Sequence, residues 1–225
     1  LTYDGDPAQT SRQQERTEAA YAQLRFGYDE WRFPVEGNAG VRVVRTRSVS
    51  HGYTIFKPTY GATTPPVVPQ FGTINEPLDA SNHYVDVLPS LNLKADLTDK
   101  LQTRFAFAKS MYRPAFNDLN EYITLSQGIT MGIGAQSGNV QSIYYSGTDK
   151  GNANLKPIRA NSFDWTLDWY PGSGSSLTLA LFRKNVRDII LNTGFTRSYK
   201  DLAGNSQSFV ITGPDNVAKG AVTGA

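Results

Sequence analysis

The chain has no cysteine among its 225 residues. Disulfide bonds and thiolate metal sites are therefore excluded, and backbone hydrogen bonds and side-chain packing must stabilise the fold. The chain also has almost no excess of one charge, because 22 Lys and Arg oppose 20 Asp and Glu. The basic residues are scattered rather than grouped, so the sequence predicts no nucleic-acid partner.

Long hydrophobic runs are missing as well. The longest apolar stretches, such as 177–182, are far shorter than the roughly 20 residues that a transmembrane helix needs. The first residues show no initiating Met, basic region or apolar region, so they are not read as a signal peptide. Any membrane role must therefore use strands, which cross a bilayer with about 9–11 residues each.

The most informative feature that is present is an alternation of apolar and polar residues. The segment 163–170 reads Phe-Asp-Trp-Thr-Leu-Asp-Trp-Tyr. Successive side chains of a strand point to opposite faces, so Phe163, Trp165, Leu167 and Trp169 share one face and two Asp and a Thr share the other. A barrel wall with lipid on one side and water on the other requires this contrast.

Similar alternation between turn residues predicts about seven antiparallel strands. They are expected at about 20–28, 37–46, 84–96, 101–112, 163–170, 176–190 and from 219 onward. The connections alternate between short (29–37, 97–100, 171–175) and long (47–81, 113–157, 192–216). The first long segment holds Pro65, Pro66 and Pro69, which do not fit inside a sheet. Antiparallel neighbours would place all short turns at one end, as in outer-membrane barrels, so the expected fold is an all-β antiparallel transmembrane β-barrel.

Several segments resemble the TonB-dependent receptors of Gram-negative outer membranes, in the proteobacterial branch of the Caulobacter and Xanthomonas type. One reads Leu-Pro-Ser-Leu-Asn-Leu-Lys at 88–94, and another reads Gly-Asn-Ala-Asn-Leu-Lys-Pro at 151–157. The full set is 19–24, 37–46, 88–94, 96–99, 110–119, 151–157 and 219–224. The chain departs from the family pattern at Ala153, where Pro is usual, and at Ile158, where an acidic residue is usual.

The resemblance implies that residues 1–225 form part of a receptor barrel domain. A full barrel of this family has roughly 22 strands around an N-terminal plug. Neither the plug motifs nor a terminal aromatic strand is seen, so the chain is expected to be a fragment with the plug domain and the C-terminal strands absent. The implied location is the Gram-negative cell outer membrane.

The implied function is energy-coupled uptake of a scarce nutrient, either an oligosaccharide or a ferric siderophore. The implied partners are the TonB energy-transducing complex acting through the plug, the rest of the barrel, outer-membrane lipid and a small-molecule nutrient. Neither catalysis nor a cofactor is expected. Two other classes stay open: a soluble β-rich carbohydrate-binding module, and a β-rich hydrolase, which is disfavoured because no catalytic set is visible.

The candidate catalytic and metal residues do not form a convincing set. Asp164 and Asp168 would be about 13 Å apart on one strand, whereas glycosidase carboxyl pairs are about 5 to 9.5 Å apart. The two histidines, His51 and His83, fall in loop regions and are expected to be solvated. The glycine-rich segment 132–138 lacks the spacing and the helix of a dinucleotide site. We therefore expect no catalytic, metal or cofactor-binding residue.

The candidate ligand-binding residues combine aromatic rings with hydrogen-bonding groups around the longest loop. They are Arg113, Asn117, Asp118, Tyr122, Tyr144 and Tyr145. Aromatic planes suit the apolar faces of sugar rings, but Tyr also suits loop packing and the lipid headgroup boundary, and that alternative stays open. Three tryptophans lie near short turns and are expected in an aromatic girdle on that side: Trp31, Trp165 and Trp169.

Overall fold

The structure is a computed structural model that describes residues 10–30, 32–58, 68–134, 139–172 and 174–225. The strands are β1 Arg12–Tyr28, β2 Val35–Phe56, β3 Ile74–Thr98, β4 Leu101–Tyr112, β5 Tyr122–Met131, β6 Val140–Asp149, β7 Ile158–Trp169, β8 Leu177–Lys200 and β9 Ser206–Gly224. A short 3-10 helix, η2, covers Phe116–Leu119. Among the described residues, no helix is long and apolar enough to cross a membrane.

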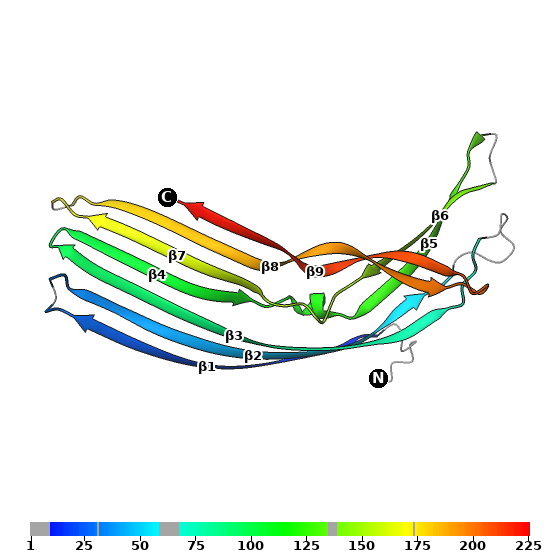
Figure 1. The fold of residues 1–225 in the computed structure, drawn as a ribbon, viewed down its shortest axis with the longest axis horizontal. Coiled ribbons are helices and arrows are strands. Elements are labelled where there is room, and N and C mark those ends of the chain that lie inside the picture. Colours follow the sequence, from blue (N-terminus) through cyan, green and yellow to red (C-terminus); the bar gives the residue numbers. More distant parts are fainter. Residues whose placement is uncertain (1–9, 31, 59–67, 135–138, 173) are drawn as a thin grey trace.

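Seven of the strands form one curved antiparallel sheet in the order β1-β2-β3-β4-β7-β8-β9, here called the wall. They correspond to the seven strands expected from the alternation, and the all-β antiparallel prediction is confirmed. The short turns after β1, β3 and β7 lie together at one end, on the left of Figure 1. The connections that were expected to be long lie toward the other end, here called the loop end.

The first of those connections is much shorter than expected. Segment 47–81 was expected to lie outside the sheet, but β2 continues to Phe56 and β3 begins at Ile74, with unbroken antiparallel pairing between them. Alternation did not reveal this extension because Ser, Thr and Gly occupy the buried positions of 48–54. Pro69 lies outside the strands as expected, and Pro65 and Pro66 lie outside the described residues.

The other two long segments are also largely strand. Residues 192–216 were expected to be a loop, yet β8 runs to Lys200 and β9 begins at Ser206. Residues 113–157 were expected to be irregular, yet they contain η2 and the antiparallel hairpin β5–β6. Backbone hydrogen bonds between strands stabilise these extra strand segments, although their sequences are rich in Ser, Thr and Gly and carry little hydrophobic alternation.

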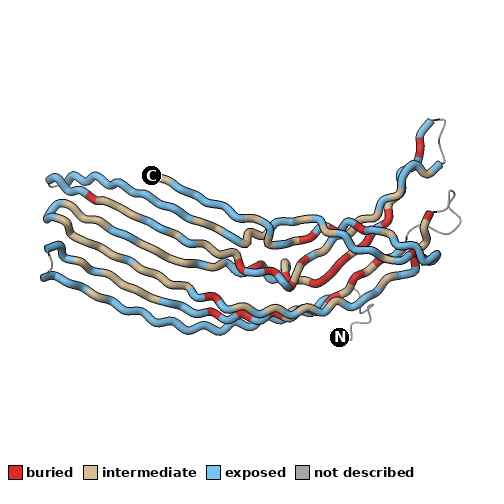
Figure 2. The backbone as a smooth tube through the Cα atoms, in the orientation of Figure 1, coloured by how far each residue is buried: buried red, intermediate tan, exposed pale blue. Residues whose placement is uncertain are grey.

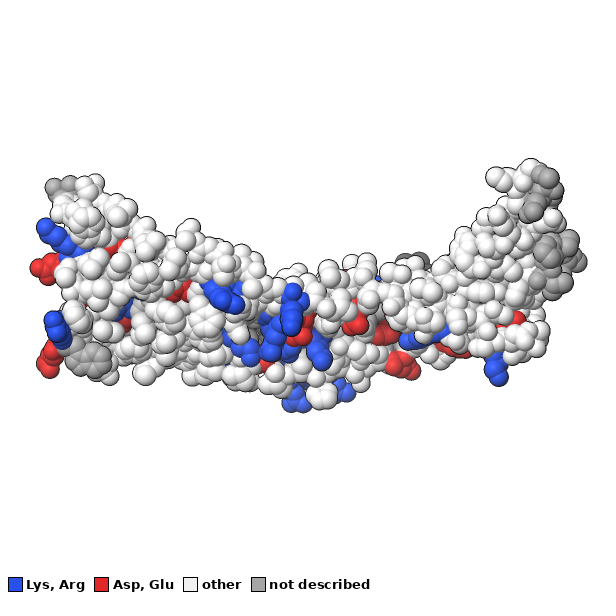
Figure 3. Space-filling view, turned by 45° about the horizontal axis from the view of Figure 1, so that its top comes forward, with Lys and Arg blue, Asp and Glu red and all other residues white. Residues whose placement is uncertain are grey.

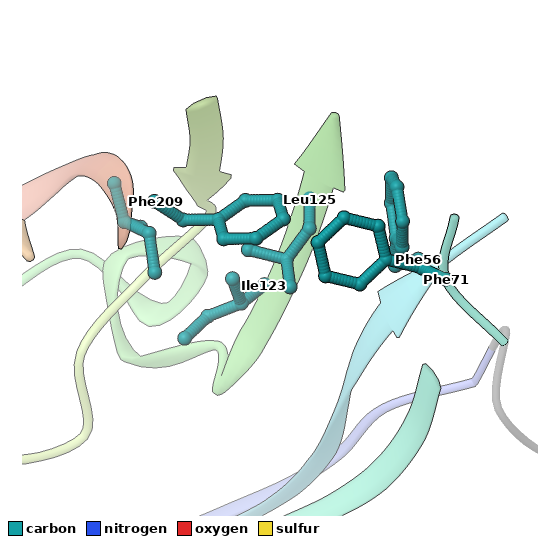
Figure 4. Close-up of a cluster of buried hydrophobic side chains, with 6 residues drawn as sticks. Phe56, Phe71, Ile123, Leu125 and Phe209 are labelled. Atoms are coloured by element: carbon teal, nitrogen blue, oxygen red, sulfur yellow. The ribbon is translucent and has the colours of Figure 1, made fainter. Parts of the chain in front are cut away.

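The β5–β6 hairpin joins the two sides of the wall at the loop end. β5 pairs in parallel with β2 at Tyr53–Phe56, beyond the point where β1 begins to pair with β2. β6 pairs in parallel with β9 through Ser146↔Val210 and the next two positions. The strands of the loop end thereby enclose a hydrophobic core of Phe56, Phe71, Ile123, Leu125, Phe209 and Ile211 (Figure 4).

Burial is concentrated in the same half of the molecule. Figure 2 shows buried residues mainly at the middle and the loop end, whereas the turn end is mostly intermediate or exposed. Among the residues that the structure describes, the turn half is a single layer with neither face covered by another element. The hairpin therefore completes the packed interior that the described residues form at the loop end.

The register sorts the wall into an apolar face and a polar face. One transverse row contains Leu93, Phe105, Trp165 and Leu181, and the next row contains Lys94, Arg104, Thr166 and Ala180. On β3 the apolar face extends from Ala95 to Val85, ten residues or about 34 Å along the strand. At a tilt of about 45° this spans about 24 Å, close to the band height of an outer-membrane barrel.

Candidate functional site

The segment 113–157 is docked against the polar face of the wall. Arg113 leaves the end of β4 and its guanidinium donates hydrogen bonds to Glu15 and, at 2.8 Å, to Thr17 Oγ1 on β1. Thr17 in turn lies 3.5 Å from Thr46 Oγ1, which is fully buried on β2. Arg113 therefore fixes the start of the segment across the polar face of β1 and β2.

Glu121 anchors the segment at its next contact with β2. Its backbone N–H donates to Ser50 Oγ at 3.2 Å, and its Oε1 accepts from the backbone N–H of Ala153 at 2.7 Å. The chains approach so closely that a Cβ on Gly52 would overlap the Glu121 carbonyl. Glycine is required at this position because only a residue without a side chain permits this backbone contact.

The return segment 150–157 is fixed by backbone and amide hydrogen bonds. Asn152 N–H donates to Asp118 O at 2.6 Å, and Asn82 Nδ2 donates to Leu155 O at 3.1 Å. Asn216 accepts from Lys156 N–H at 2.7 Å and donates to Lys156 O at 3.0 Å. The motif at 151–157 therefore connects β3, η2 and β9 through hydrogen bonds.

Two carboxyl groups of the docked segment have raised pKa values. Burial raises the pKa of Asp149 to about 7, and the neighbouring Glu121 carboxylate adds to this shift. Burial also raises the pKa of Glu121, against the hydrogen bond from Ala153. Ionisation of either group is therefore disfavoured while the hairpin is docked. Sequence patterns did not reveal this pair, because 28 residues separate the two carboxyl groups along the chain.

An ion-pair cluster lies where β4 and β7 reach the docked segment. Arg159 donates to Asp86 Oδ1 at 2.5 Å and to Asp188 Oδ2 at 3.0 Å. Asp86 is 3% exposed, so its charge is compensated almost entirely by Arg159. These ion pairs join the start of β7 to β3 and to β8.

The six candidate ligand residues are not gathered at one point. Tyr145 packs in the hydrophobic core, 5.0 Å from the Phe209 ring between centroids, and Tyr122 is 8% exposed beside β2. Asp118 accepts a hydrogen bond from the return segment through its backbone oxygen. Tyr144 is 56% exposed and lies over Gly128, where a Cβ would overlap its ring. Asn117 is exposed on η2, and Arg113 is partly exposed.

The remaining candidate residues have ordinary partners. Asp168 accepts from Thr178 Oγ1 at 2.8 Å on the next strand, and Asp164 is exposed. His51 and His83 were expected in loop regions, but they lie on β2 and β3, and His51 pairs with Asp79 at 2.6 Å. Within the described ranges, no group of three or more His, Asp or Glu could hold a metal ion. Trp165 and Trp169 lie on the apolar face of β7, and Trp31 lies outside the described residues.

Comparison with protein families gives a match over residues 1–224 with the family described as TonB dependent receptor-like, beta-barrel. No curated protein sequence matches the chain. The residues quoted above for the resemblance all lie within this matched range.

Solved structures of receptors are similar to the chain at low sequence identity. The hemophore receptor HasR of Serratia marcescens, a double mutant in complex with its hemophore HasA and heme, has 17% identity and a TM-score of 0.52, with 93% of this chain and 30% of that chain covered. The siderophore receptor PirA from Acinetobacter baumannii has 16% identity and a TM-score of 0.47, with 95% and 34% covered. The chain therefore spans about a third of the length of these receptors.

Proposed function

Because the chain belongs to the TonB-dependent receptor-like β-barrel family, we propose that it is part of the wall of an outer-membrane receptor that takes up a scarce nutrient. Energy would reach the receptor from the TonB complex through a plug domain. The short turns would face the periplasm and the loop end would face the outside, as in other outer-membrane barrels. The function is transport and requires no bond-making chemistry from these residues.

The two-faced wall is the observation that carries this proposal. Its apolar face presents large hydrophobic side chains to solvent, including Phe163 at 39%, Trp169 at 47% and Leu177 at 64% exposure. No second sheet covers this face in the part of the chain that the structure describes. A soluble carbohydrate-binding module would bury such side chains between two sheets. Lipid contact accounts for their exposure without a second layer.

The cargo would meet the loop end, where the six candidate residues differ in what they can do. Tyr144, Arg113 and Asn117 have accessible side chains and would contact the cargo directly. Tyr122, Tyr145 and Asp118 would position the docked segment that carries the others. An aromatic ring, an amide and a guanidinium group suit either the face and edge of an oligosaccharide or an anionic ferric siderophore.

The test is an uptake assay with the receptor that contains this chain, expressed in cells with and without TonB. A radiolabelled oligosaccharide and a radiolabelled ferric siderophore are the two cargo arms. We expect TonB-dependent uptake in one arm. Recovery of the receptor in the soluble fraction, with sugar binding that needs no TonB, would instead support the binding-module alternative.

The direct contact proposed for Tyr144 is tested in the same cells with Tyr144→Ala. Loss of one such contact costs about 1–3 kcal/mol, so uptake at limiting cargo should fall by about fivefold or more. Tyr170→Ala is the matched control, because Tyr170 is also exposed but directly follows β7, where the chain enters a turn at the turn end. Equal uptake by both variants would remove Tyr144 from the cargo site.

A further inference from the structure

The apolar face of the wall changes abruptly to a basic surface near the middle of the molecule. On β8 the residues of this face read Leu177, Leu179, Leu181, then Arg183, Asn185 and Arg187. In the view of Figure 3, Lys and Arg side chains gather near the middle of the molecule's length. The change from apolar to basic residues lies at the loop-end border of the apolar face, between Leu181 and Arg183.

Neighbouring strands change at the same level. Register places Lys109, Asn161, Asn185 and Ala221 in one row of this face, just beyond the row of Phe107 and Phe163. Arg187 lies opposite Arg159 in the following row. The basic surface therefore runs across β4, β7, β8 and β9 rather than along a single strand.

A hollow of about 390 Å³ lies within this surface, and both apolar residues, such as Val186 and Ala221, and polar or basic residues of β7, β8 and β9 line it. Asn161 and Asn185 contribute amides, and Arg187 and Lys219 contribute positive charges. Arg159 also lines the hollow, but its guanidinium is already committed to Asp86 and Asp188. An anion in the hollow would therefore be bound by Arg187, Lys219 and the amides of Asn161 and Asn185.

These cations are weakly compensated. Within the described ranges, Lys109, Arg183 and Lys219 form no ion pair, and Arg187 lies 3.9 Å from its nearest carboxylate, Asp188. The turn end of the wall differs, because its connections mix acidic residues (Asp29, Glu30, Asp99) with basic ones (Arg32, Lys100). The excess of positive charge is thus specific to the loop-end border of the apolar band.

We propose that Lys109, Arg183, Arg187 and Lys219 form a binding site for the phosphate groups of anionic lipid in the outer leaflet. This inference rests on the proposed function, because it needs the apolar face to lie in lipid. The acyl chains would cover Phe163 and Leu181, and the phosphates would sit one or two rows higher, against the cations and the amides of Asn161 and Asn185. Basic clusters at this depth bind anionic headgroups by charge and by hydrogen bonds from Arg.

The test uses the receptor that contains this chain, purified in a neutral detergent and titrated with short-chain phosphatidic acid. The patch variant is K109Q/R187Q/K219Q. The matched control is R25Q/R42Q/K184Q, which also removes three positive charges but on the polar face of the wall. We expect the patch variant to bind phosphatidic acid at least tenfold more weakly and the control to bind like the unaltered receptor.

Two further measurements distinguish a lipid phosphate from free phosphate, and the lipid site from the proposed transport function. Inorganic phosphate should not displace the lipid at equal concentration, since it lacks acyl chains; displacement would overturn the lipid assignment. Equal weakening in the patch and control variants, or none in either, would overturn the site. Uptake with TonB is measured on the same unaltered receptor, so a receptor that transports cargo but shows no patch effect refutes this inference alone.

Discussion

An arginine placed on the two faces of β7 should reveal which face meets lipid. Leu167 and Thr166 are neighbours on the strand and so lie at the same depth on opposite faces. Leu167 lies between Thr103 and Leu179 on the apolar face, about midway along the stretch of apolar residues on β7 and β8. Thr166 lies between Arg104 and Ala180 on the polar face.

The expected costs differ because only one of the two arginines would enter hydrocarbon. Leu167→Arg near the bilayer midplane should lower the free energy of unfolding by about 2–4 kcal/mol. Thr166→Arg would add a cation beside Arg104, but Asp164 and Asp168 flank it on the same face and offset the repulsion. We expect a change of no more than about 1 kcal/mol there.

The measurement is a denaturant titration of the receptor refolded into lipid vesicles, followed by tryptophan fluorescence. A shift of 2–4 kcal/mol corresponds to a change of roughly 30- to 700-fold in the folding equilibrium, which is readily resolved. Similar costs for the two variants, or a greater cost at Thr166, would refute the assignment of the apolar face to lipid.

Three predictions concern the docked hairpin. Gly52→Val should undock it, because a side chain there overlaps the Glu121 carbonyl, whereas Gly27→Ala, with no atom within 4 Å of its added Cβ, should not; protease sensitivity of β5–β6 distinguishes them. Phe209→Ala should cost about 3–5 kcal/mol at the loop end, because this fully buried ring contacts four aromatic rings; amide hydrogen exchange of β5, β6 and β9 measures the loss. Burial raises the pKa of Asp149 from 3.8 to about 7, so the docked state holds a proton that the undocked state releases. Docking should therefore weaken as pH rises from about 4 to 7 and level off above. Asp149→Asn should flatten that slope in pH-dependent amide hydrogen exchange, and an unchanged slope would show that other groups cause it.

The wall was predictable from the sequence because each of its strands has one apolar face and one polar face. Alternation placed Phe163, Trp165 and Leu167 on one side, and the register confirms that they align with apolar neighbours on β4 and β8. The seven wall strands and the grouping of the short turns followed from this pattern. The same pattern stops where both faces become polar, so the strand ends beyond Thr46 and Ile190 were missed.

The docked hairpin was not predictable because long-range backbone contacts position it. The parallel pairing of Tyr53 with Tyr122 and the hydrogen bond between Glu121 and Ala153 leave no periodic signal in the sequence. The sequence predicts that the aromatic residues of this segment contact the ligand, and the structure separates them into accessible rings such as Tyr144 and core rings such as Tyr145. Chemistry alone could not make that separation, since both are Tyr on adjacent positions.

A nitroxide scan along 163–169 in the receptor reconstituted into bilayers tests the central claim most directly. The chain has no cysteine of its own, so each introduced Cys is the only attachment site within it. Collisions with oxygen, which concentrates in lipid, should be frequent at 163, 165, 167 and 169, and collisions with a water-soluble nickel chelate should be frequent at 164, 166 and 168. Accessibility to oxygen without a two-residue period, or with the period inverted, would contradict a wall whose apolar face lies in the membrane.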